Sequence, residues 1–336
     1  MTQKIVNVGL IGFGFSGKYI HSQLIMANNT LNLKVVCDQQ ASVEGDHPFI
    51  LTRDPDAIFN DPEIELVVIS TPNLTHFPLA QAALLANKHV VVDKPFTVTL
   101  HEAETLAALA RQQGKIICAF QNRRWDSDFL TVRKLLEEKT LGQVTYFESN
   151  YTFYQPTVRD GWREKNQAGA GVWFDLGAHL IDQMLQLFGE PQKGCVNFAM
   201  QRENAHSPDF FHAIFIYPTL RVVLQGNLLS AASPARFHIN GTTGSFVKYG
   251  QDPQEDALIA HQDPNGENWG KDNNEGIITS VSNDQPEMHA YPSERGNYPE
   301  FYRQLANAIR GQGEAPVKIA EVLSSMRIIE QTPRLD

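Results

Sequence analysis

The chain has 336 residues, of which 42% are hydrophobic and 20% are charged, a composition typical of a globular protein with about two domains. Its formal net charge of −10 argues against a nucleic acid or an anionic membrane as a partner, because no basic stretch offsets the acidic residues. We therefore expect a small molecule as the partner.

The apolar runs, such as 6–15 and 66–69, are shorter than the ~20 residues that a membrane helix needs. The first residues lead directly into a strand pattern rather than a signal peptide, so we expect a cytoplasmic protein. Cys37, Cys118 and Cys195 lie far apart in the sequence, each within an apolar strand pattern. They indicate buried thiols rather than a disulfide framework or a metal site.

Short β-branched runs alternate with helical patterns through the first 120 residues. The predicted strands cover residues 6–11, 33–37, 66–69, 89–92 and 116–120, and the predicted helices cover 18–27, 77–86 and 100–111. The strand runs are almost continuously apolar, which indicates burial on both faces of a sheet. Alternation of this kind predicts right-handed crossovers and a parallel, doubly wound α/β sheet.

The first predicted strand runs into GFGFSG, where Gly12, Gly14 and Gly17 have the G-x-G-x-x-G spacing. A simple turn is the alternative, but a strand precedes the motif and an amphipathic segment follows it. Gly12 would permit the tight turn, Gly14 would let a pyrophosphate approach the backbone, and Gly17 would let the helix pack on the strand. This pattern predicts a Rossmann dinucleotide-binding domain over residues 1–122. Its predicted cofactor-binding loop consists of Gly12, Gly14, Phe15, Ser16 and Gly17.

Asp38 ends the second predicted strand, 21 residues beyond Gly17. Its carboxylate would accept hydrogen bonds from the adenosine ribose and repel a 2′-phosphate, which favours NAD over NADP. Gln39 and Gln40 are neutral and the next arginine is Arg53, so NADP remains the alternative cofactor.

The strand at 66–69 ends in the segment STPNLTH. Ligands of doubly wound sheets bind at the carboxyl ends of the strands, so Thr71, Pro72 and Asn73 are expected to border the cofactor. His76 follows in the first turn of a predicted helix, where it either contacts the cofactor or has a structural role.

The next predicted strand ends in DKP, with Lys94 between Asp93 and Pro95. A lysine at the carboxyl end of a buried parallel strand would point its ammonium group into the crevice that holds the nicotinamide. We therefore assign Lys94 and Pro95 to the cofactor site, while the resemblance described below implies that Lys94 also acts in catalysis and substrate binding. A surface salt bridge to Asp93 is the alternative.

A later helical pattern, bounded by Gly171 and Gly189, contains Asp175 and His179. The i, i+4 spacing would put both side chains on one helix face. A carboxylate behind a histidine is a usual arrangement for a general base. Metal binding by this pair is the less favoured alternative, since no third ligand is evident and we expect no metal.

The sequence pattern changes after Asn122. Stretches with a hydrophobic period of two residues occur at 144–154, 210–217, 221–229 and 237–240. They predict an α+β domain over residues 123–336 with a large, mainly antiparallel sheet. Residues 261–297 are rich in Asn, Asp, Gly and Pro, which indicates loops and a mobile flap.

Four polar or aromatic residues outside these elements are candidates for substrate contact. Trp162 and Arg163 lie in a predicted loop ahead of the Asp175 helix, where they either bind substrate hydroxyls or only pack. Asn122 and Arg124 belong to the segment NRRWD, which either touches the ligand or joins the two domains.

Taken together, GFGFSG, TPNLTH, DKP, NRRWD and DLGAH resemble the Gfo/Idh/MocA group of sugar and polyol oxidoreductases over essentially the whole chain. The segments QNRRWDSDFLTVRKLL, GWRE, VKYGQDPQEDAL and NWG are similar to its scyllo-inositol dehydrogenase branch. The resemblance implies that Lys94, Asp175 and His179 are catalytic. It also implies an open-faced second sheet that another subunit covers, so we expect a homodimer or a higher homo-oligomer.

The resemblance implies hydride transfer between NAD and a secondary alcohol of a cyclic polyol or sugar. Inositol is the first candidate for this substrate. His179 would take the hydroxyl proton while Lys94 holds the oxygen, although Lys94 is an equal candidate for the base. The rivals are an NADPH-dependent ketosugar reductase and a non-catalytic cofactor-sensing protein. The chain stops at QTPRLD, where relatives usually continue, which we expect to weaken the packing of the last helix or to alter assembly.

Overall fold

A computed structural model describes residues 4–40, 47–282 and 285–335. It divides into two compact units. The first unit contains residues 1–122, 254–269 and 297–326, and the second contains 123–253, 270–296 and 327–336. Segments 254–269 and 297–326 lie in the range that we assigned to the second domain from the sequence. They pack with the first unit through side chains such as Tyr302 and Phe301, which the sequence pattern does not connect to it.

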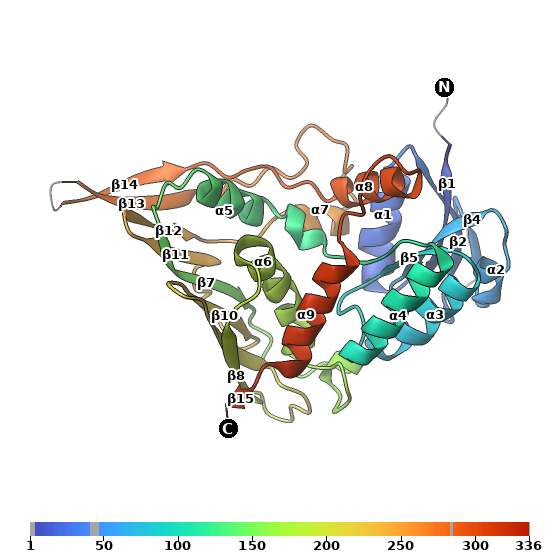
Figure 1. Ribbon diagram of the computed structural model, residues 1–336, viewed down its shortest axis with the longest axis horizontal. Helices are drawn as coiled ribbons and strands as arrows, with labels where there is room; N and C mark the ends of the chain where they lie inside the picture. Colours follow the sequence, from blue (N-terminus) through green and yellow to red (C-terminus); the bar gives the residue numbers. More distant parts are fainter. Residues whose placement is uncertain (1–3, 41–46, 283–284, 336) are drawn as a thin grey trace. The chain divides into compact units, whose positions relative to one another are not determined.

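The first unit is built on a parallel sheet with the strand order β3-β2-β1-β4-β5-β6 (Figure 1). Its strands are β1 Val6–Ile11, β2 Leu31–Cys37, β3 Ile50–Thr52, β4 Ile64–Ile69, β5 His89–Val92 and β6 Ile117–Ala119. Strand β4 is almost completely buried, as expected for a strand covered on both faces. The predicted doubly wound parallel sheet is thus confirmed.

Helices connect these strands and cover the sheet. They are η1 Ser16–His21, α1 Ser22–Met26, α2 Asp56–Phe59, η2 Asn73–Thr75, α3 His76–Leu85, α4 Leu100–Gln113, α7 Gln254–Ile259 and α8 Pro299–Ile309. Helix α4 begins with a capping box. The Thr99 side chain accepts the Glu102 backbone N–H, and the Glu102 side chain accepts the Thr99 backbone N–H. It ends at Gly114, which has a φ of 62°.

The second unit is built on a nine-stranded sheet with the order β14-β13-β12-β11-β7-β10-β9-β8-β15. Its strands are β7 Val144–Thr152, β8 Lys193–Ala199, β9 Phe210–Ile216, β10 Arg221–Asn227, β11 Phe237–Gly241, β12 Gly244–Lys248, β13 Gly276–Ser282, β14 Gln285–Tyr291 and β15 Arg334–Leu335. Within this sheet, the described pairs β10–β7 and β15–β8 are parallel, and the other described pairs are antiparallel. The mainly antiparallel sheet is confirmed.

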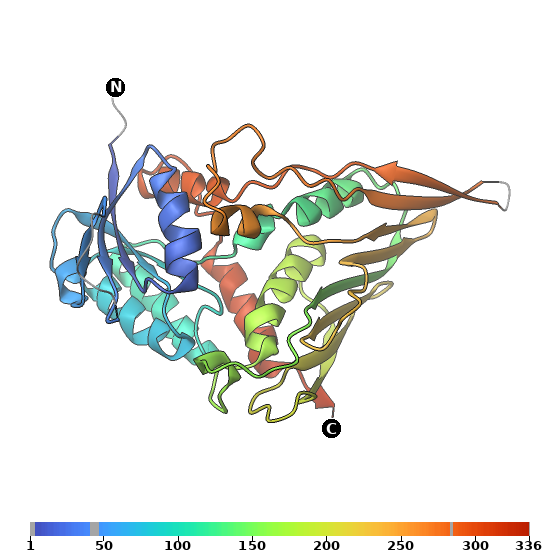
Figure 2. The same ribbon diagram turned by 180° about the vertical axis from the view of Figure 1, so that it is seen from behind.

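One face of this second sheet carries helices. The helical segments of the unit are η3 Asn122–Trp125, α5 Ser127–Glu137, η4 Trp162–Glu164, η5 Trp173–Gly177 and α6 Ala178–Phe188. Figures 1 and 2 place α5 and α6 on the same face, and no described helix of this unit lies on the other. Strand β9 alternates buried and half-buried residues, as a strand with one covered face should.

The structure corrects one expectation for the second half. Strands β13 and β14 pair as a hairpin in the range 261–297, where the sequence indicated only loops and a flap. Ile277, Ile278 and Val281 supply the β-branched residues that favour a strand there. At the other end, helix α9 Ile319–Gln331 is followed by β15, which pairs with β8. The Trp173 Nε1–H donates to the Ile329 carbonyl at 2.9 Å, so the last helix is held in place.

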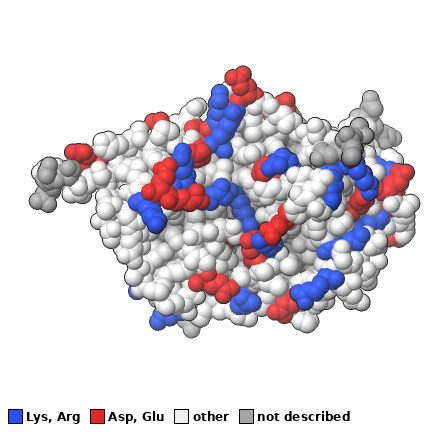
Figure 3. Space-filling view, turned by 45° about the horizontal axis from the view of Figure 1, so that its top comes forward, with Lys and Arg blue, Asp and Glu red and all other residues white. Residues whose placement is uncertain are grey.

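The described surface carries mixed charges. On the face shown in Figure 3, lysines and arginines lie interspersed with aspartates and glutamates. Exposed ion pairs include Lys4–Glu65 at 2.6 Å, a kind of contact that contributes little to stability. None of the described helices has both the length and the apolar character needed to cross a bilayer.

Candidate active site

The glycine-rich loop follows β1, and its three glycines meet different surroundings. Gly12 has a φ of +96°, and a Cβ there would lie 2.2 Å from the Ser70 carbonyl oxygen. A Cβ on Gly17 would lie 2.0 Å from the Gly12 carbonyl oxygen. A Cβ on Gly14 would meet no atom within 4 Å. Gly12 and Gly17 are therefore required by packing, whereas Gly14 keeps a backbone surface open to a ligand such as a pyrophosphate.

The helix after this loop begins as the π-helical turn η1 and continues as α1. The Lys18 backbone N–H donates to the Gly14 carbonyl at 2.9 Å. Phe15 is 52% exposed at the start of this turn. Single π-helical turns occur frequently at functional sites, and a helix N-terminus after a glycine loop attracts phosphate.

Asp38 lies at the carboxyl end of β2 and binds the loop directly. Its Oδ2 accepts the Phe13 backbone N–H at 2.7 Å, and its Oδ1 accepts the Gln40 backbone N–H at 2.8 Å. The Asp38 backbone N–H donates to the Thr52 carbonyl, which continues the β2–β3 pairing. This pairing brings Arg53 beside Asp38, a proximity that the distance in sequence conceals.

The segment after β4 is held by His76, which is fully buried. The His76 Nδ1 lies 2.9 Å from the Pro95 carbonyl oxygen, and its Nε2 lies 2.9 Å from the Thr71 carbonyl oxygen. Burial lowers the pKa of His76, so the neutral ring donates to one of the two carbonyls. His76 therefore joins the ends of β4 and β5, which is the structural role among the two that we considered.

Other residues predicted to border the cofactor follow the same strand. The Thr75 hydroxyl donates to the Pro72 carbonyl at 2.7 Å and, at 2.7 Å from the Thr71 hydroxyl, accepts its proton. Asn73 is only 4% exposed. Of these residues, Thr71 and Pro72 present the more accessible surface at the carboxyl end of β4.

Lys94 follows β5 and is half-buried. The Lys94 backbone N–H donates to Asp93 Oδ1 at 2.9 Å, and the Lys94–Pro95 bond is cis. Asp93 Oδ2 accepts the Ser16 hydroxyl at 2.7 Å and the Ser70 hydroxyl at 3.2 Å. The residue before the lysine thus binds the glycine-rich loop and the end of β4, a connection that the sequence did not indicate.

In the second unit, Asp175 lies in the π-helical turn η5 and His179 in the first turn of α6. A π-helical turn is wider than an α-helical one, so the i, i+4 geometry expected for these two residues does not apply unchanged. Asp175 Oδ1 lies 3.3 Å from the Arg163 Nε. His179 is 4% exposed.

The Trp162–Arg163 loop is fastened to the same unit. The Arg163 guanidinium lies 4.4 Å from the centre of the Trp162 ring. Glu164 accepts two hydrogen bonds from the buried Arg202, at 2.6 and 3.1 Å, and Arg202 also donates to Asp209 at 3.0 Å. This ionic network holds the loop whose Arg163 pairs with Asp175.

Arg124 contacts helix α6. It donates from Nε and Nη2 to the two carboxylate oxygens of Asp182, at 2.8 and 2.6 Å, and both side chains are buried. Asn122 is 5% exposed. The Arg124–Asp182 contact lies within the second unit, so ligand contact and domain joining both stay predictions for the NRRWD segment.

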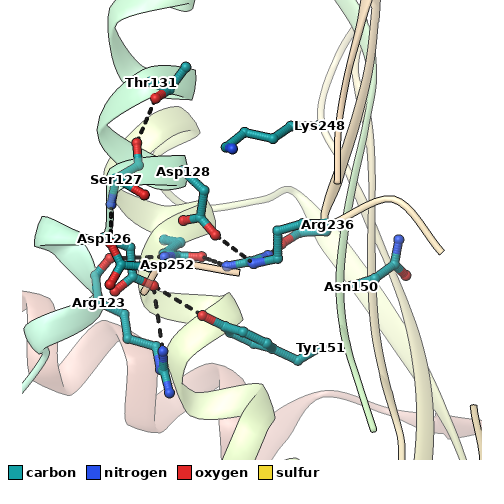
Figure 4. Close-up of polar contacts among 12 residues, drawn as sticks. Arg123, Asp126, Ser127, Asp128, Thr131, Asn150, Tyr151, Arg236, Lys248 and Asp252 are labelled. Carbon is teal, nitrogen blue, oxygen red and sulfur yellow. Dashed lines mark hydrogen bonds and ion pairs between the residues drawn. The ribbon is translucent and has the colours of Figure 1, made fainter. Parts of the chain in front are cut away.

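Behind α6 lies a buried polar cluster that the sequence did not reveal (Figure 4). Arg236 lies 3.3 Å from Asp128 and stacks on the Tyr151 ring at 4.0 Å. It also donates to Gln183 of α6 at 2.8 Å. The Tyr151 hydroxyl donates to Asp126 at 3.1 Å, and burial raises the pKa of Tyr151. These contacts fix α6, and with it His179, against the sheet.

No group of three or more His, Cys, Asp or Glu side chains suited to a metal ion occurs in residues 4–40, 47–282 and 285–335. The predicted buried thiols are present at Cys37 and Cys118, whereas Cys195 is partly exposed.

Comparisons with known proteins agree with this architecture. The model of the oxidoreductase family NAD-binding Rossmann fold, GFO_IDH_MocA, matches residues 6–121. The model of the C-terminal alpha/beta domain of the same family matches residues 133–334.

Two curated relatives extend over almost the whole chain. The oxidoreductase YdgJ of Escherichia coli is 46% identical, over 97% of this chain and 94% of that protein. The scyllo-inositol 2-dehydrogenase (NADP(+)) IolW of Bacillus subtilis is 38% identical, over 97% of this chain and 92% of that protein.

The solved structures include similar chains. An oxidoreductase from Yersinia pestis has a TM-score of 0.92 and 45% identity, with 98% of this chain and 94% of that one covered. The oxidoreductase yvaA from Bacillus subtilis has a TM-score of 0.94 and 37% identity, with 98% and 95% covered.

Proposed function

Because the chain belongs to the Gfo/Idh/MocA family of oxidoreductases, we propose that it oxidises a secondary alcohol of a cyclic polyol or sugar, with inositol as the preferred substrate, and passes the hydride to NAD. Family membership makes the chain an NAD(P)-binding oxidoreductase and speaks against the non-catalytic rival. The name of the Bacillus subtilis relative supports inositol as the substrate.

The observation that carries the cofactor assignment is made at Gly14. A Cβ there would meet no atom within 4 Å, whereas a Cβ on Gly12 or Gly17 would clash with a backbone oxygen. The residues present therefore fit a dinucleotide, whose nicotinamide would supply the hydride acceptor. We assign the pyrophosphate to Gly14, Phe15 and Ser16, and the strand-end contacts to Thr71 and Pro72. The proposal keeps a cofactor domain over 1–122 and a substrate and assembly domain over 123–336, from which segments 254–269 and 297–326 return to pack with the first unit.

Lys94 and His179 are the proposed catalytic residues. The Lys94 ammonium would donate to the alcohol oxygen and stabilise the negative charge that develops there. His179 would accept the hydroxyl proton, with Asp175 as the nearby carboxylate. Arg163 and Trp162 would bind other substrate hydroxyls. The chemistry requires the Lys94 and His179 side chains to reach the same carbinol, and Lys94 as the base is the variant of the mechanism to be tested.

A second candidate is a reductase of a ketosugar that uses NADPH. Two observations favour it: the Bacillus subtilis relative is named for NADP(+), and Arg53 lies beside Asp38 through the β2–β3 pairing. The negative charge of Asp38 favours NAD, because it would repel the 2′-phosphate of NADP.

We also propose a homodimer in which a second copy covers the free face of the second sheet. Exposed apolar side chains of the unit, among them Met200 at 60% and Met288 at 68%, favour such a contact.

A cytoplasmic location fits the free thiols. Burial, with a smaller effect of the Asp38 charge, raises the pKa of Cys37 to about 11.

The test is a screen of the purified protein with inositol stereoisomers, aldoses and ketosugars, each with both cofactors and in both directions. We expect the highest kcat/KM for a cyclic polyol with NAD. Activity confined to ketosugar reduction with NADPH would establish the second candidate instead.

A further inference from the structure

The ends of β4 and β5 and the cofactor loop meet at one half-buried carboxylate, that of Asp93. Asp93 Oδ1 accepts the Lys94 backbone N–H, and Oδ2 accepts the hydroxyls of Ser16 and Ser70. Ser16 belongs to the loop proposed to bind the pyrophosphate, and Lys94 is the proposed catalytic amine. A displacement of the loop is therefore transmitted to the lysine through one side chain.

A histidine and a tyrosine lie behind this carboxylate. The His21 Nε2 lies 3.5 Å from Asp93 Oδ2, and its Nδ1 lies 2.6 Å from the Tyr302 hydroxyl. The His21 side chain is 0% exposed and its ring packs on Phe120 at 4.1 Å. Tyr302 is fully buried in α8. The Nδ1 contact is a hydrogen bond, whereas Nε2 faces the Asp93 carboxylate without a well-formed hydrogen bond.

The electrostatics of Asp93 and Tyr302 reflect this arrangement. Burial raises the pKa of Asp93, but the His21 imidazole, the Ser16 hydroxyl and the Lys94 charge outweigh it and hold the pKa below its usual range. Burial, and then the Asp93 charge, raises the pKa of Tyr302 well above its usual range, so its hydroxyl stays protonated.

The other titratable groups around this chain of contacts come from neighbouring elements. His76 of α3 interacts with the Asp93 charge, and Cys118 of β6 interacts with Tyr302. Both lie in the first unit, so the whole arrangement is internal to it.

We propose that Tyr302, His21 and Asp93 form a positioning relay that keeps Asp93 ionised and couples the cofactor loop to Lys94. The inference rests on the proposed function for the role of Lys94, but not on the identity of the substrate. His21, Tyr302 and Asp93 are positioning residues, since they act through Ser16 and Lys94.

The first arm of the test is kcat at the pH optimum for the full-length protein and four variants. In His21→Leu, Asp93 loses the imidazole that packs against it, so Lys94 is held less well and kcat should fall by about tenfold. His21→Gln, which keeps a donor, should restore most of kcat. Tyr302→Phe should lower kcat by less than His21→Leu. Tyr217→Phe removes a buried hydroxyl that donates to the Gly189 carbonyl and should leave kcat unchanged.

The second arm needs no substrate. Acetic anhydride labelling of Lys94, quantified by mass spectrometry, is followed with and without NADH, and NADH binding is measured by fluorescence. NADH should protect Lys94 in the wild-type chain and in Tyr217→Phe. In Asp93→Asn and His21→Leu the protection should fall by about fivefold or more while the NADH Kd changes by less than about threefold. These Kd values also show that the variants fold.

Unaltered protection in both variants, or a fall in kcat as large in Tyr217→Phe as in His21→Leu, would overturn the relay. If no polyol or sugar is oxidised by the wild-type chain, the proposed function fails, and the labelling arm still decides on the relay.

Discussion

His179 is a buried imidazole in the first turn of α6, on the helix that Arg124 and Arg236 hold in place through Asp182 and Gln183. Because these contacts do not involve the imidazole, its removal should leave the helix in position. In His179→Ala we expect kcat to fall by ~10²–10⁴-fold, the contribution of a general base, while cofactor affinity persists.

The control is His212→Ala, which removes a half-buried imidazole from β9 of the same unit. Steady-state kinetics of both variants, with NADH binding measured in parallel, checks the prediction. Turnover that survives in His179→Ala would make Lys94 the base.

Cofactor choice should depend on Asp38 and Arg53 together. Serine at position 38 keeps an oxygen for the Phe13 N–H but removes the charge that repels a 2′-phosphate. We expect Asp38→Ser to raise the kcat/KM ratio of NADP+ to NAD+ by about tenfold, which corresponds to ~1.4 kcal/mol. Adding Arg53→Gln should reverse most of this gain, because the neighbouring cation is lost. An unchanged ratio in Asp38→Ser would remove the carboxylate from cofactor selection.

Residues whose surroundings are local could be predicted from the sequence. The close approach of Gly17 to the Gly12 carbonyl follows from a strand, a turn and a helix that are consecutive in the sequence. Partners far apart in sequence could not be predicted: Tyr302 lies 281 positions from His21, and Arg236 lies 53 positions from Gln183. Such pairs depend on tertiary packing, which a single sequence does not display.

At the scale of elements, the glycine-rich turn gives a matched pair of substitutions. Gly17→Ala would place a methyl group 2.0 Å from a backbone oxygen, whereas Gly14→Ala meets nothing within 4 Å. We expect Gly17→Ala to lower the free energy of unfolding by about 2 kcal/mol or more through overpacking. Gly14→Ala should melt like the wild-type chain but bind NADH about tenfold more weakly.

Thermal unfolding and NADH titration of the two variants distinguish these effects. Equal loss of stability in both variants would mean that the open surface at Gly14 is a feature of packing and not a ligand contact.

Element types were predictable where the periodicity was long and unbroken. The buried strands β1, β2, β4 and β5 follow from apolar runs, and α4 follows from its helical spacing and its caps. The hairpin of β13 and β14 was missed because Asn, Asp and Gly around it suggest loops, while its stability comes from pairing with β12. The turn η5 was predicted as a regular helix, since a π-helical insertion leaves no clear mark in the sequence.

At the scale of the whole molecule, the first unit depends on residues from late in the chain. Phe120 packs against Phe301 with ring centres 4.8 Å apart, and Gln254 accepts hydrogen bonds from Trp269 and from the Tyr298 backbone. A fragment of residues 1–122 would expose the surfaces that these residues cover. We expect it to unfold without a cooperative transition, in contrast to the intact chain.

Scanning calorimetry of the fragment and of the full-length protein checks this expectation. A fragment that melts cooperatively near the temperature of the intact chain would show that the two returning segments add little. The overall fold class was predictable because strand–helix alternation extends over a third of the chain, whereas the return of 254–269 and 297–326 leaves no periodic signal.

The central claim is that a hydride leaves the carbon of a secondary alcohol in a cyclic polyol. The most direct measurement uses scyllo-inositol deuterated at its ring carbons, offered with NAD+ to the full-length protein, and mass spectrometry of the nicotinamide product. We expect reduced cofactor that carries the deuterium, formed on the order of 10²-fold more slowly by Lys94→Met and by His179→Ala. Reduced cofactor without deuterium, or none with any deuterated cyclic polyol, would contradict the claim.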